Sequence, residues 1–499
     1  MHTVSHSPAT LLPRHAGVTR PAAARIVAAA AGRLPLALAG ALAAMTNPAV
    51  HRIGLLAILL DLPLQIDSNV GYLPGADEFG GLAGFNVSIT TLALVVLYIR
   101  WALLTLTRRA DRSRTPWRAV LPLLAYVGFA GVSVFAAGDT ALSLRELFLL
   151  GQTFLLYVYI VYRVRGRDEV MWILRWLVAG LAVESTLMLV GAYRAESFSL
   201  PGVHLRAERG GWVFVDATYG NRVGGTIGSP NGAAAYLSVM LSPALCLMLL
   251  SKGLRKVLAI AGLVLGIMAI VTTQSRGGWT ATLVSFAVFY GVLAWRGRVS
   301  IKAPLIAGAL VGVALLLMQD TIVSRLTEDD NGSAQSRLPL MRTAAQMIGD
   351  HPLFGVGANN YSRAMKRYGA VYGDWGDWVF TVHNKYALVW AETGLGGIAA
   401  FVWFLASTMR RGFQGAKGAD PLMSTVALAL TAALAGHLIH LGVDLFSERA
   451  QVQLLWTVAA LITVVRELAI APAGSLADGP AAARPRTTPA ALTGSLAGA

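Results

Sequence analysis

Apolar runs of about 20 residues alternate with short polar connections along most of this chain. A helical run of that length crosses the hydrocarbon core of a bilayer, since each residue rises 1.5 Å. The first run is the least regular, because Asp61 and Pro63 interrupt it. The pattern predicts an all-α integral membrane protein. About twelve transmembrane helices are expected, at 48–66, 84–106, 119–137, 141–162, 170–193, 232–250, 254–273, 278–295, 302–318, 384–407, 421–442 and 450–469.

Composition supports a membrane protein and narrows its chemistry. Hydrophobic residues make up 55% of the 499 residues and charged residues 13%, which excludes an ordinary water-soluble fold. The single cysteine, Cys246, excludes an intrachain disulfide. The net charge of +15 does not predict a nucleic-acid partner, because the basic residues cluster at the ends of apolar runs and not in a stripe interleaved with aromatics.

Basic residues predict the orientation, because short cytoplasmic loops of membrane proteins carry an excess of Lys and Arg. Residues 67–83 hold three acidic residues and no basic one, as expected of an external connection. Both termini are therefore predicted to be cytoplasmic. The connections predicted to be cytoplasmic contain Arg108, Arg109, Arg112, Arg114 and Arg118, then Arg163, Arg165 and Arg167, then Lys252, Arg255 and Lys256, then Arg296, Arg298 and Lys302, and finally Arg410, Arg411 and Lys417.

This orientation divides the chain into five parts. Residues 1–47 are predicted to be a cytoplasmic segment with an amphipathic helix, and residues 48–318 to hold the first nine spans. Residues 319–383 would be a large, helical external loop, residues 384–470 the last three spans, and residues 471–499 a disordered cytoplasmic tail. Function is expected in the external loop, because connections of that length are uncommon unless they bind or catalyse.

The external side also carries arginines, against the charge rule. Arg276 begins the eighth span, where a guanidinium near hydrocarbon is costly. Ser275 can cap that helix, and helix-end N–H groups together with Arg276 would suit a phosphate group. The alternative is that Arg276 reaches to lipid headgroups. The other external arginines of interest are Arg222, Arg337 and Arg342.

Two further segments have both a structural and a functional interpretation. Asn231 begins the sixth span after a Gly-rich stretch, either as a helix cap or as a polar group at the interface. In the large loop, Ser336 predicts the start of a helix that ends near Gly349, with Arg337 in its first turn. We expect the apolar face of that helix to pack onto the membrane domain; it consists of Leu338, Met341, Ala345 and Ile348.

His383 and Asn384 stand at the external mouth of the tenth span. Glu392 follows nine residues later, about 13 Å deeper along a continuous helix, so it should not pair with His383. A lone interfacial histidine is often structural. Its place among arginines that suit an anion favours a proton-exchanging role instead.

The order of these motifs resembles the O-antigen ligase and O-antigen polymerase superfamily of bacterial envelopes. The resemblance covers about 220–405, whereas the first 200 residues match only as hydrophobic helices. The motifs are Gly-x-x-x-x-Pro-Asn ending at Asn231, Ser-Arg-Gly at 275–277, an arginine at 337 followed by His-Pro-Leu-x-Gly-Val-Gly at 351–357, and His383-Asn384 followed after nine residues by Gly-x-x-Gly.

The resemblance implies a metal-independent inverting glycosyltransferase of the GT-C class in the bacterial inner membrane, with a periplasmic active site and no cofactor. Its donor would be an oligosaccharide on undecaprenyl diphosphate, and its other partners a glycan or lipid A-core acceptor, membrane lipids and a chain-length regulator. Arg276 and Arg337 would hold the diphosphate, and His383 would act on the acceptor hydroxyl. Supporting positions would be Arg222, Asn231, Ser275, Arg342, Asn384 and Glu392. The acidic residues 328–330 are interpreted as a solvated turn and not as metal ligands.

The motifs leave several activities open. Aromatic residues between Tyr368 and Phe380 suit stacking on sugars and favour a polymerase of O-antigen or exopolysaccharide repeats, although they could equally be loop core or an interfacial belt. A ligase that joins glycan to lipid A-core, or a protein O-oligosaccharyltransferase, is the alternative. A transporter is less favoured, because the residues of interest lie at one surface and not near the bilayer midplane.

Overall fold

The structure is a computed structural model, and the residues it describes are 40–72, 82, 84–107, 117–200, 213–215, 222–299, 337–371 and 381–471. Within these ranges, nine helices are long and apolar enough to cross a membrane. They are α3 (Ile89–Leu106), α5 (Thr140–Arg163), α6 (Arg167–Arg194), α7 (Pro230–Leu250), α8 (Leu254–Thr272), α9 (Arg276–Trp295), α14 (Lys385–Ala416), α15 (Pro421–Leu441) and α16 (Arg449–Ile470).

Nine of the twelve predicted spans correspond to these helices, and the other three differ. The first is α2 (Pro48–Leu64), which is bent by 53° from the short helix Gly40–Thr46. The third is α4 (Leu121–Ser133), a shorter helix that continues as the 3-10 turn η2 (Val134–Ala136). The ninth, at 302–318, lies outside the described residues. The described part of the chain therefore holds nine spans, or ten if the bent pair crosses as one.

Residues 40–53 and 97–107 belong to a compact unit of their own. Helix Gly40–Thr46 ends just before Pro48, because proline disfavours a helical conformation in the residue before it. Arg100 compensates for the break: its Nε donates to the carbonyl of Asn47 at 3.3 Å and its Nη2 to that of Thr46 at 3.4 Å. The guanidinium thus adds a donor to two carbonyl groups at the point where the helix is interrupted.

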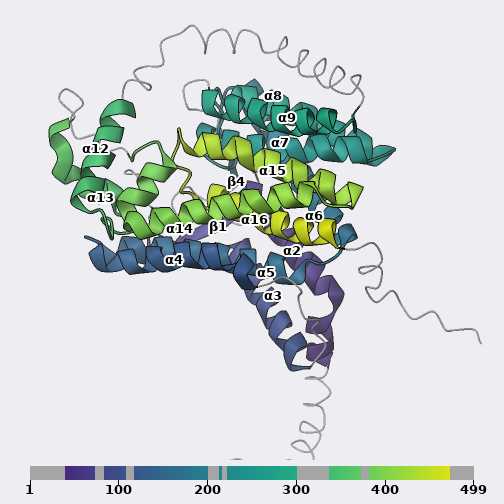
Figure 1. Cartoon of the computed structure of the whole chain (residues 1–499), viewed down its shortest axis with the longest axis horizontal. Coiled ribbons are helices and arrows are strands. Elements are labelled where there is room, and N and C mark those ends of the chain that lie inside the picture. The colour runs from purple at the N-terminus through teal and green to yellow at the C-terminus, as the bar shows by residue number, and fades with distance from the viewer. Residues whose placement is uncertain are drawn as a thin grey trace, which may run out of the picture. The chain divides into compact units, whose positions relative to one another are not determined.

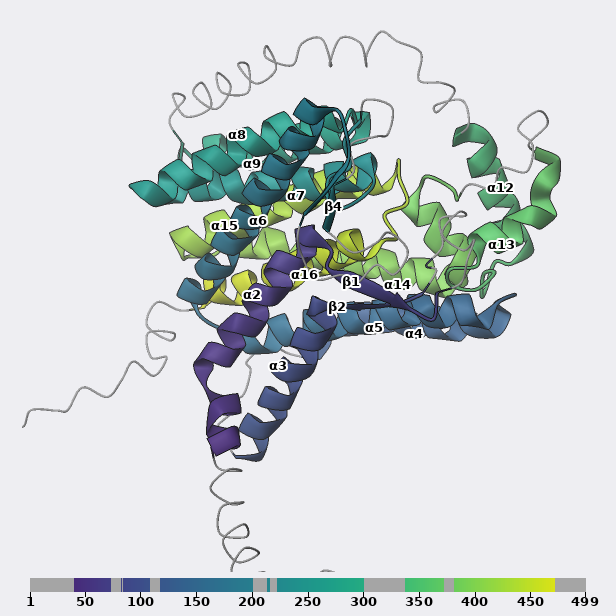
Figure 2. The ribbon, with the colours of Figure 1, turned by 180° about the vertical axis from the view of Figure 1, so that it is seen from behind.

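The second unit contains the main helical bundle. Most residues of α7, α15 and α16 are buried, so these three helices form its centre (Figure 1). Helices α6, α8 and α9 pack on the α7 side, and α4, α5 and α14 pack on the α16 side (Figure 2). The short helices η1 (Trp117–Ala119), α12 (Arg337–Asp350), α13 (Tyr361–Met365) and η3 (Lys366–Val371) complete it.

Two short antiparallel hairpins accompany the helices and were not predicted. Strand β1 (Asp67–Val70) pairs with β2 (Phe85–Ser88), with Asp67 opposite Ser88. Strand β3 (Phe198–Leu200) pairs with β4 (Val213–Val215). Both lie in connections between helices, where strands of three or four residues give no detectable alternation of apolar and polar positions.

Asp61 interrupts the apolar sequence of the first predicted span, and its carboxylate pairs with Arg449. Nη1 of Arg449 lies 2.6 Å from the Asp61 carboxylate, and Nε lies 3.0 Å from that of Asp67. All three side chains are at most 3% exposed. The buried ion pairs join α2 and β1 to the first residue of α16, and so fix where the connection between α15 and α16 lies.

The connections predicted to be cytoplasmic meet at one end of the bundle. Arg167 pairs with Asp420 at 2.6 Å, Arg296 donates to the carbonyl of Ala416 at 2.5 Å, and Arg298 donates to Ser424 at 2.9 Å. These contacts agree with an arrangement in which alternate connections share a side. Which side faces the cytoplasm stays a prediction.

Candidate functional site

The predicted site residues begin with Arg276, the first residue of α9. The Ser275 side chain accepts a hydrogen bond from the Gly278 N–H, so Ser275 is the helix cap that the sequence predicts. Arg276 is exposed. A Cβ at Gly277 would lie 2.8 Å from the His440 ring, so this glycine lets the first turn of α9 approach the end of α15.

Arg222 and Asn231 form a hydrogen-bonded pair at the same end of the bundle. Nη2 of Arg222 donates to Oδ1 of Asn231 at 2.7 Å, and its Nε donates to the carbonyl of Thr273 at 2.9 Å. The cap of α7 is Ser229, whose side chain accepts from the Gly232 N–H. Of the two interpretations of Asn231, helix capping is therefore wrong, and a polar group at the membrane interface stays a prediction.

Asp444 is the residue that the sequence prediction missed. It lies in the connection 442–448 between α15 and α16 and is buried. Burial raises the pKa of its carboxyl above the ordinary value. The charges of His383 and Arg337 and the side-chain amide of Asn231 partly oppose that rise. Three residues predicted to share a site therefore surround a carboxylate that was not part of the prediction.

His383 and Asn384 are held against this connection by hydrogen bonds. The Asn384 side chain caps α14 by accepting from the Ala387 N–H at 3.0 Å, and its Nδ2 donates to the carbonyl of Gly442 at 3.0 Å. Nδ1 of His383 lies 3.0 Å from the carbonyl oxygen of Thr381. Because a carbonyl only accepts, Nδ1 carries the hydrogen in the neutral ring, and Nε2 carries the lone pair.

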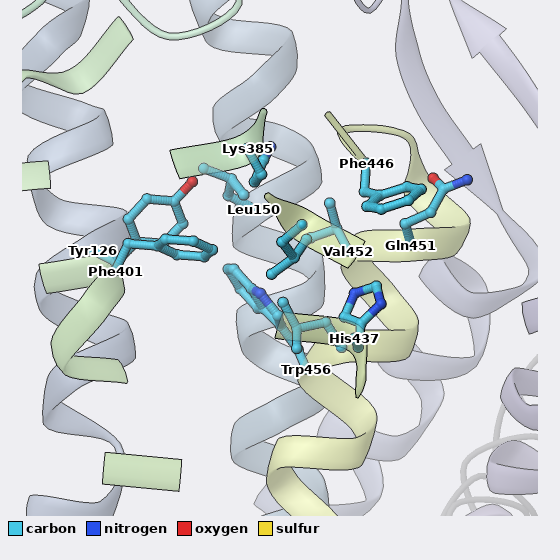
Figure 3. A pocket seen from close by; sticks show the side chains of 11 residues that line it. Tyr126, Leu150, Lys385, Phe401, His437, Phe446, Gln451, Val452 and Trp456 are labelled. Carbon is cyan, nitrogen blue, oxygen red and sulfur yellow. The ribbon is translucent and has the colours of Figure 1, made fainter. Parts of the chain in front are cut away.

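Lys385 fastens the same connection at two points. Its backbone N–H donates to the carbonyl of Asp444 at 3.0 Å, and its Nζ donates to Oγ of Ser447 at 2.8 Å. Lys385 also lines a small pocket, with Tyr126 and Phe401 on one side and His437 and Phe446 on the other (Figure 3). Among the described residues, neither ring nitrogen of His437 has a hydrogen-bond partner.

Glu392 follows His383 along one helical stretch, so the predicted separation of the two side chains stands, but this stretch does not continue as a straight span. The helix breaks at Gly394, with φ 69° and ψ −170°. The rings of Tyr386 and Phe401 are only 6.2 Å apart, whereas fifteen residues of straight helix would separate them by about 22 Å. Residues 385–393, which we term the arm, therefore fold back on residues 395–416.

The outer end of the arm binds the segment that follows α12. Glu392 accepts a hydrogen bond from the Tyr361 N–H at 3.2 Å, and its carbonyl accepts from the Gly357 N–H at 3.0 Å. The carbonyl of Ala391 accepts from the Val356 N–H at 2.9 Å. Glu392 thus joins the arm to the segment that follows α12.

Helix α12 positions Arg337, but not by the predicted face. Leu340, Ala344 and Met347 are buried, in a cluster with residues of α13 and the arm. The predicted packing residues Leu338 and Met341 are 59% and 38% exposed. Leu340, Ala344 and Met347 are spaced to share one side of the helix, so α12 packs against α13 and the arm through a second apolar stripe.

Arg337 lies at the start of α12, close enough for its charge to act on both Asp444 and His440. Through His440 this arginine and the first turn of α9 belong to one site. The contacts therefore bring together Arg222, Asn231, Arg337, His383, Asn384 and Asp444, and Arg276 lies nearby in the first turn of α9. Arg342 is exposed on α12, and no contact of the described residues brings it to this group.

Several predicted features lie outside the described residues. They are Ser336, the acidic residues 328–330, and the aromatic residues between 372 and 380. Tyr368 is described, and its hydroxyl donates to the carboxylate of Asp350 at 2.9 Å. For this one aromatic, the contact favours a role in the loop itself over sugar stacking. No three His, Cys, Asp or Glu side chains within the described ranges are grouped as metal ligands.

The chemistry of the site combines three cationic groups with two groups that accept protons. Arg222, Arg276 and Arg337 can stabilise an anion, and Arg can do so through two parallel N–H donors. His383 and Asp444 can take a proton from a hydroxyl. Such a site suits the displacement of an acidic leaving group by a hydroxyl nucleophile.

Comparison with known proteins gives one match. The model of a family described as O-Antigen ligase matches residues 261–402, from within α8 to within α14. The matched range contains Arg276, Arg337 and His383, and excludes Arg222, Asn231 and Asp444. No curated protein matches the chain.

Proposed function

We propose that this protein transfers glycan from an undecaprenyl-diphosphate-linked donor to a hydroxyl acceptor. The match of residues 261–402 to the O-Antigen ligase family, whose members are membrane glycan transferases, supports the proposal. The acceptor is the growing end of another repeat unit, so that the enzyme polymerises O-antigen or exopolysaccharide. The reaction takes place on the periplasmic face of the inner membrane, and both termini are cytoplasmic.

The observation that carries this proposal is the meeting of Arg337, His383 and Asp444 at one end of the bundle. A lipid diphosphate presents two phosphate groups near a membrane surface, and guanidinium groups bind phosphate well. A basic ring and a carboxylate beside them supply what a hydroxyl nucleophile needs. Asp444 lies outside the range that the family model matches, so its contacts support this chemistry in addition to the match.

In the proposed reaction, the acceptor oxygen attacks C1 of the donor sugar as the bond from C1 to the diphosphate oxygen breaks. The acceptor proton passes to Nε2 of His383, and the Asp444 carboxylate stabilises the imidazolium that forms. The diphosphate leaves with the electron pair, and Arg337 and Arg276 stabilise its growing negative charge. A single displacement of this kind inverts the configuration at C1.

The direct test is a reconstituted assay. The purified protein in lipid nanodiscs is given undecaprenyl-diphosphate-linked repeat units alone, and the products are measured by mass spectrometry. A polymerase yields lipid-linked glycans with two, three and more repeats, with the new linkage inverted. Absence of any glycan transfer from several lipid-linked donors, with or without added acceptors, would overturn the proposed function.

Ligation to lipid A-core is a second candidate, because the matched family is described as O-Antigen ligase. The same assay decides when lipid A-core is added, since a ligase transfers one finished glycan to it and leaves the donor pool unextended. Cells lacking the protein give a further distinction. Loss of a polymerase leaves single lipid-linked repeats, whereas loss of a ligase leaves long lipid-linked chains.

A further inference from the structure

A fully buried carboxylate lies near the middle of α6, a helix that holds none of the predicted site residues. Glu184 is 0% exposed. Its Oε1 accepts a hydrogen bond from the Thr226 N–H at 2.9 Å, its Oε2 lies against the Thr226 hydroxyl, and the Ile227 N–H also donates to the carboxylate. In the described part of the chain these partners are all neutral. The carboxylate therefore serves to hold the backbone of one loop.

The loop in question, residues 222–229, is shaped around that carboxylate. A Cβ at Gly225, whose φ is +61°, would lie 2.1 Å from Oε1 of Glu184, so only glycine fits there. The Thr226 hydroxyl also lies 2.6 Å from the carbonyl of Pro63 in α2. The turn is thus pressed closely onto α6 at its middle.

The other side of the loop is fastened to the end of α8. The Val223 N–H donates to the carbonyl of Thr272 at 3.1 Å, and Nε of Arg222 donates to that of Thr273 at 2.9 Å. Arg222 then reaches Asn231, whose amide faces Asp444. A continuous series of contacts therefore leads from Glu184 through the loop to the candidate catalytic carboxylate.

An acidic side chain within a membrane helix is costly. A purely structural contact between α6 and the loop could be made by apolar side chains without that cost. The carboxylate is suited to something that apolar groups cannot do, which is to accept several N–H donors and set the orientation of the loop backbone.

We propose that Glu184 is a positioning residue that fixes the 222–229 loop, so that Arg222 holds Asn231 against Asp444. The inference rests on the proposed function for its catalytic consequence only. Its structural part, the dependence of the loop on Glu184, can be tested without any glycan transfer.

The test compares four variants of the full-length protein in nanodiscs. Glu184→Leu removes the acceptors, and Thr226→Val removes the hydroxyl from the opposite side of the contact. Glu184→Gln keeps an oxygen for the Thr226 N–H and offers an N–H to the Thr226 oxygen. Ser185→Ala is the matched control, because Ser185 is the next residue of α6 and its buried hydroxyl has no partner among the described residues.

Two measurements are made on each variant. Amide hydrogen exchange of the peptide containing 222–229 reports the order of the loop. The pH dependence of kcat/KM for the lipid-linked donor reports the state of Asp444. A merely stabilising role for Glu184 would lower the unfolding temperature without moving the midpoint of that pH profile.

We expect Glu184→Leu to speed exchange of the loop and to lower kcat/KM about tenfold, the effect of losing one well-formed buried hydrogen bond. The acid midpoint moves to higher pH, because the Asn231 amide no longer lowers the pKa of Asp444. Thr226→Val should change both readouts in the same direction, Glu184→Gln should restore most of the rate, and Ser185→Ala should match the wild type.

Unchanged exchange and an unchanged pH midpoint in Glu184→Leu would overturn the inference. If that variant does not fold, the same two results in Thr226→Val overturn it instead. If the wild type transfers no glycan, the proposed function fails, and hydrogen exchange still decides whether Glu184 orders the loop.

Discussion

Nη2 of Arg222 donates a hydrogen bond of 2.7 Å to Oδ1 of Asn231. This bond fixes the amide, because an oxygen that accepts from a guanidinium leaves the NH2 group on the other side. That group is then directed to Asp444. An arginine can therefore act on the candidate catalytic carboxylate without touching it.

We expect replacement of Asn231 by Leu to shift the acid limb of the rate profile. Transfer requires ionised Asp444, and burial places its pKa above the ordinary value of about 3.9. The wild-type midpoint should therefore lie above that value, and loss of the Asn231 donor should raise it further. Steady-state rates between pH 4 and 8 measure the shift. An identical midpoint in the variant would contradict the role given to Asn231.

The Asp444 carboxyl should also affect the stability of the fold, with a pH dependence opposite to that of the transfer rate. A folded-state pKa raised above the unfolded value means that the folded protein binds the proton more tightly. The stabilisation is present below the ordinary pKa of aspartic acid and is lost as the pH rises through the folded-state pKa of Asp444. Thermal unfolding of wild type and Asp444→Asn in detergent measures it. Their difference should change across this pH window and be constant above it.

Arg337 should be required for transfer but not for folding. We expect Arg337→Ala to lower kcat by about 10²–10³, the usual effect of removing one donor to the developing charge. The kcat of Arg337→Lys should lie between those of the wild type and Arg337→Ala, since lysine keeps the charge without the paired donors. The control is Arg363→Ala, since Arg363 is exposed and makes a surface ion pair with Asp139 at 3.4 Å. Equal losses in the alanine variants would rule out a specific role for Arg337.

The chain reversal at Gly394 should not tolerate a side chain. A Cβ there would lie 2.1 Å from the carbonyl oxygen of Leu353, and φ is +69°. We expect Gly394→Ala to lower both the unfolding temperature and the transfer rate, because His383 directly precedes the arm. The matched control is Gly291→Ala in α9, where a Cβ meets no atom within 4 Å. This variant should be neutral or slightly more stable.

The buried ion pairs of Arg449 should make a large contribution to stability. Replacing Arg449 by Met leaves the carboxylates of Asp61 and Asp67 buried without their cation, at a cost of about 3–5 kcal/mol. Chemical denaturation monitored by tryptophan fluorescence measures the loss. Lys252→Met, at an exposed position, should change the free energy of unfolding by less than about 0.5 kcal/mol. A similar small change in Arg449→Met would show that the pairs are dispensable.

Sequence reasoning succeeded where a feature depends on neighbours along the chain. Helix lengths follow from apolar runs, and the cap at Ser275 follows from its place before α9. Asp444 could not be found in this way, because its importance comes from Asn231 and His383, which other helices bring to it. The signal available was weak: Asp444 is one of two acidic residues in a short connection predicted to be external.

Two errors came from local patterns that admit more than one structure. Helix α12 carries two apolar stripes, and spacing alone does not tell whether Leu338 or Leu340 faces the core. The sequence Gly-Leu-Gly-Gly at 394–397 lies inside an apolar run and was treated as part of one helix. Clustered glycines also permit a helix break, and the close packing of Leu353 and its neighbours against Gly394 favours that break.

The reversal at Gly394 also resolves a mismatch with the thickness of a bilayer. A straight helix of 32 residues would be about 48 Å long, well beyond a hydrocarbon layer of about 30 Å. The part after Gly394 is about 33 Å long, close to the lengths of α15 and α16. The surplus residues of the arm thus need not cross the bilayer, and Asn384, just before them, is held against the connection between α15 and α16.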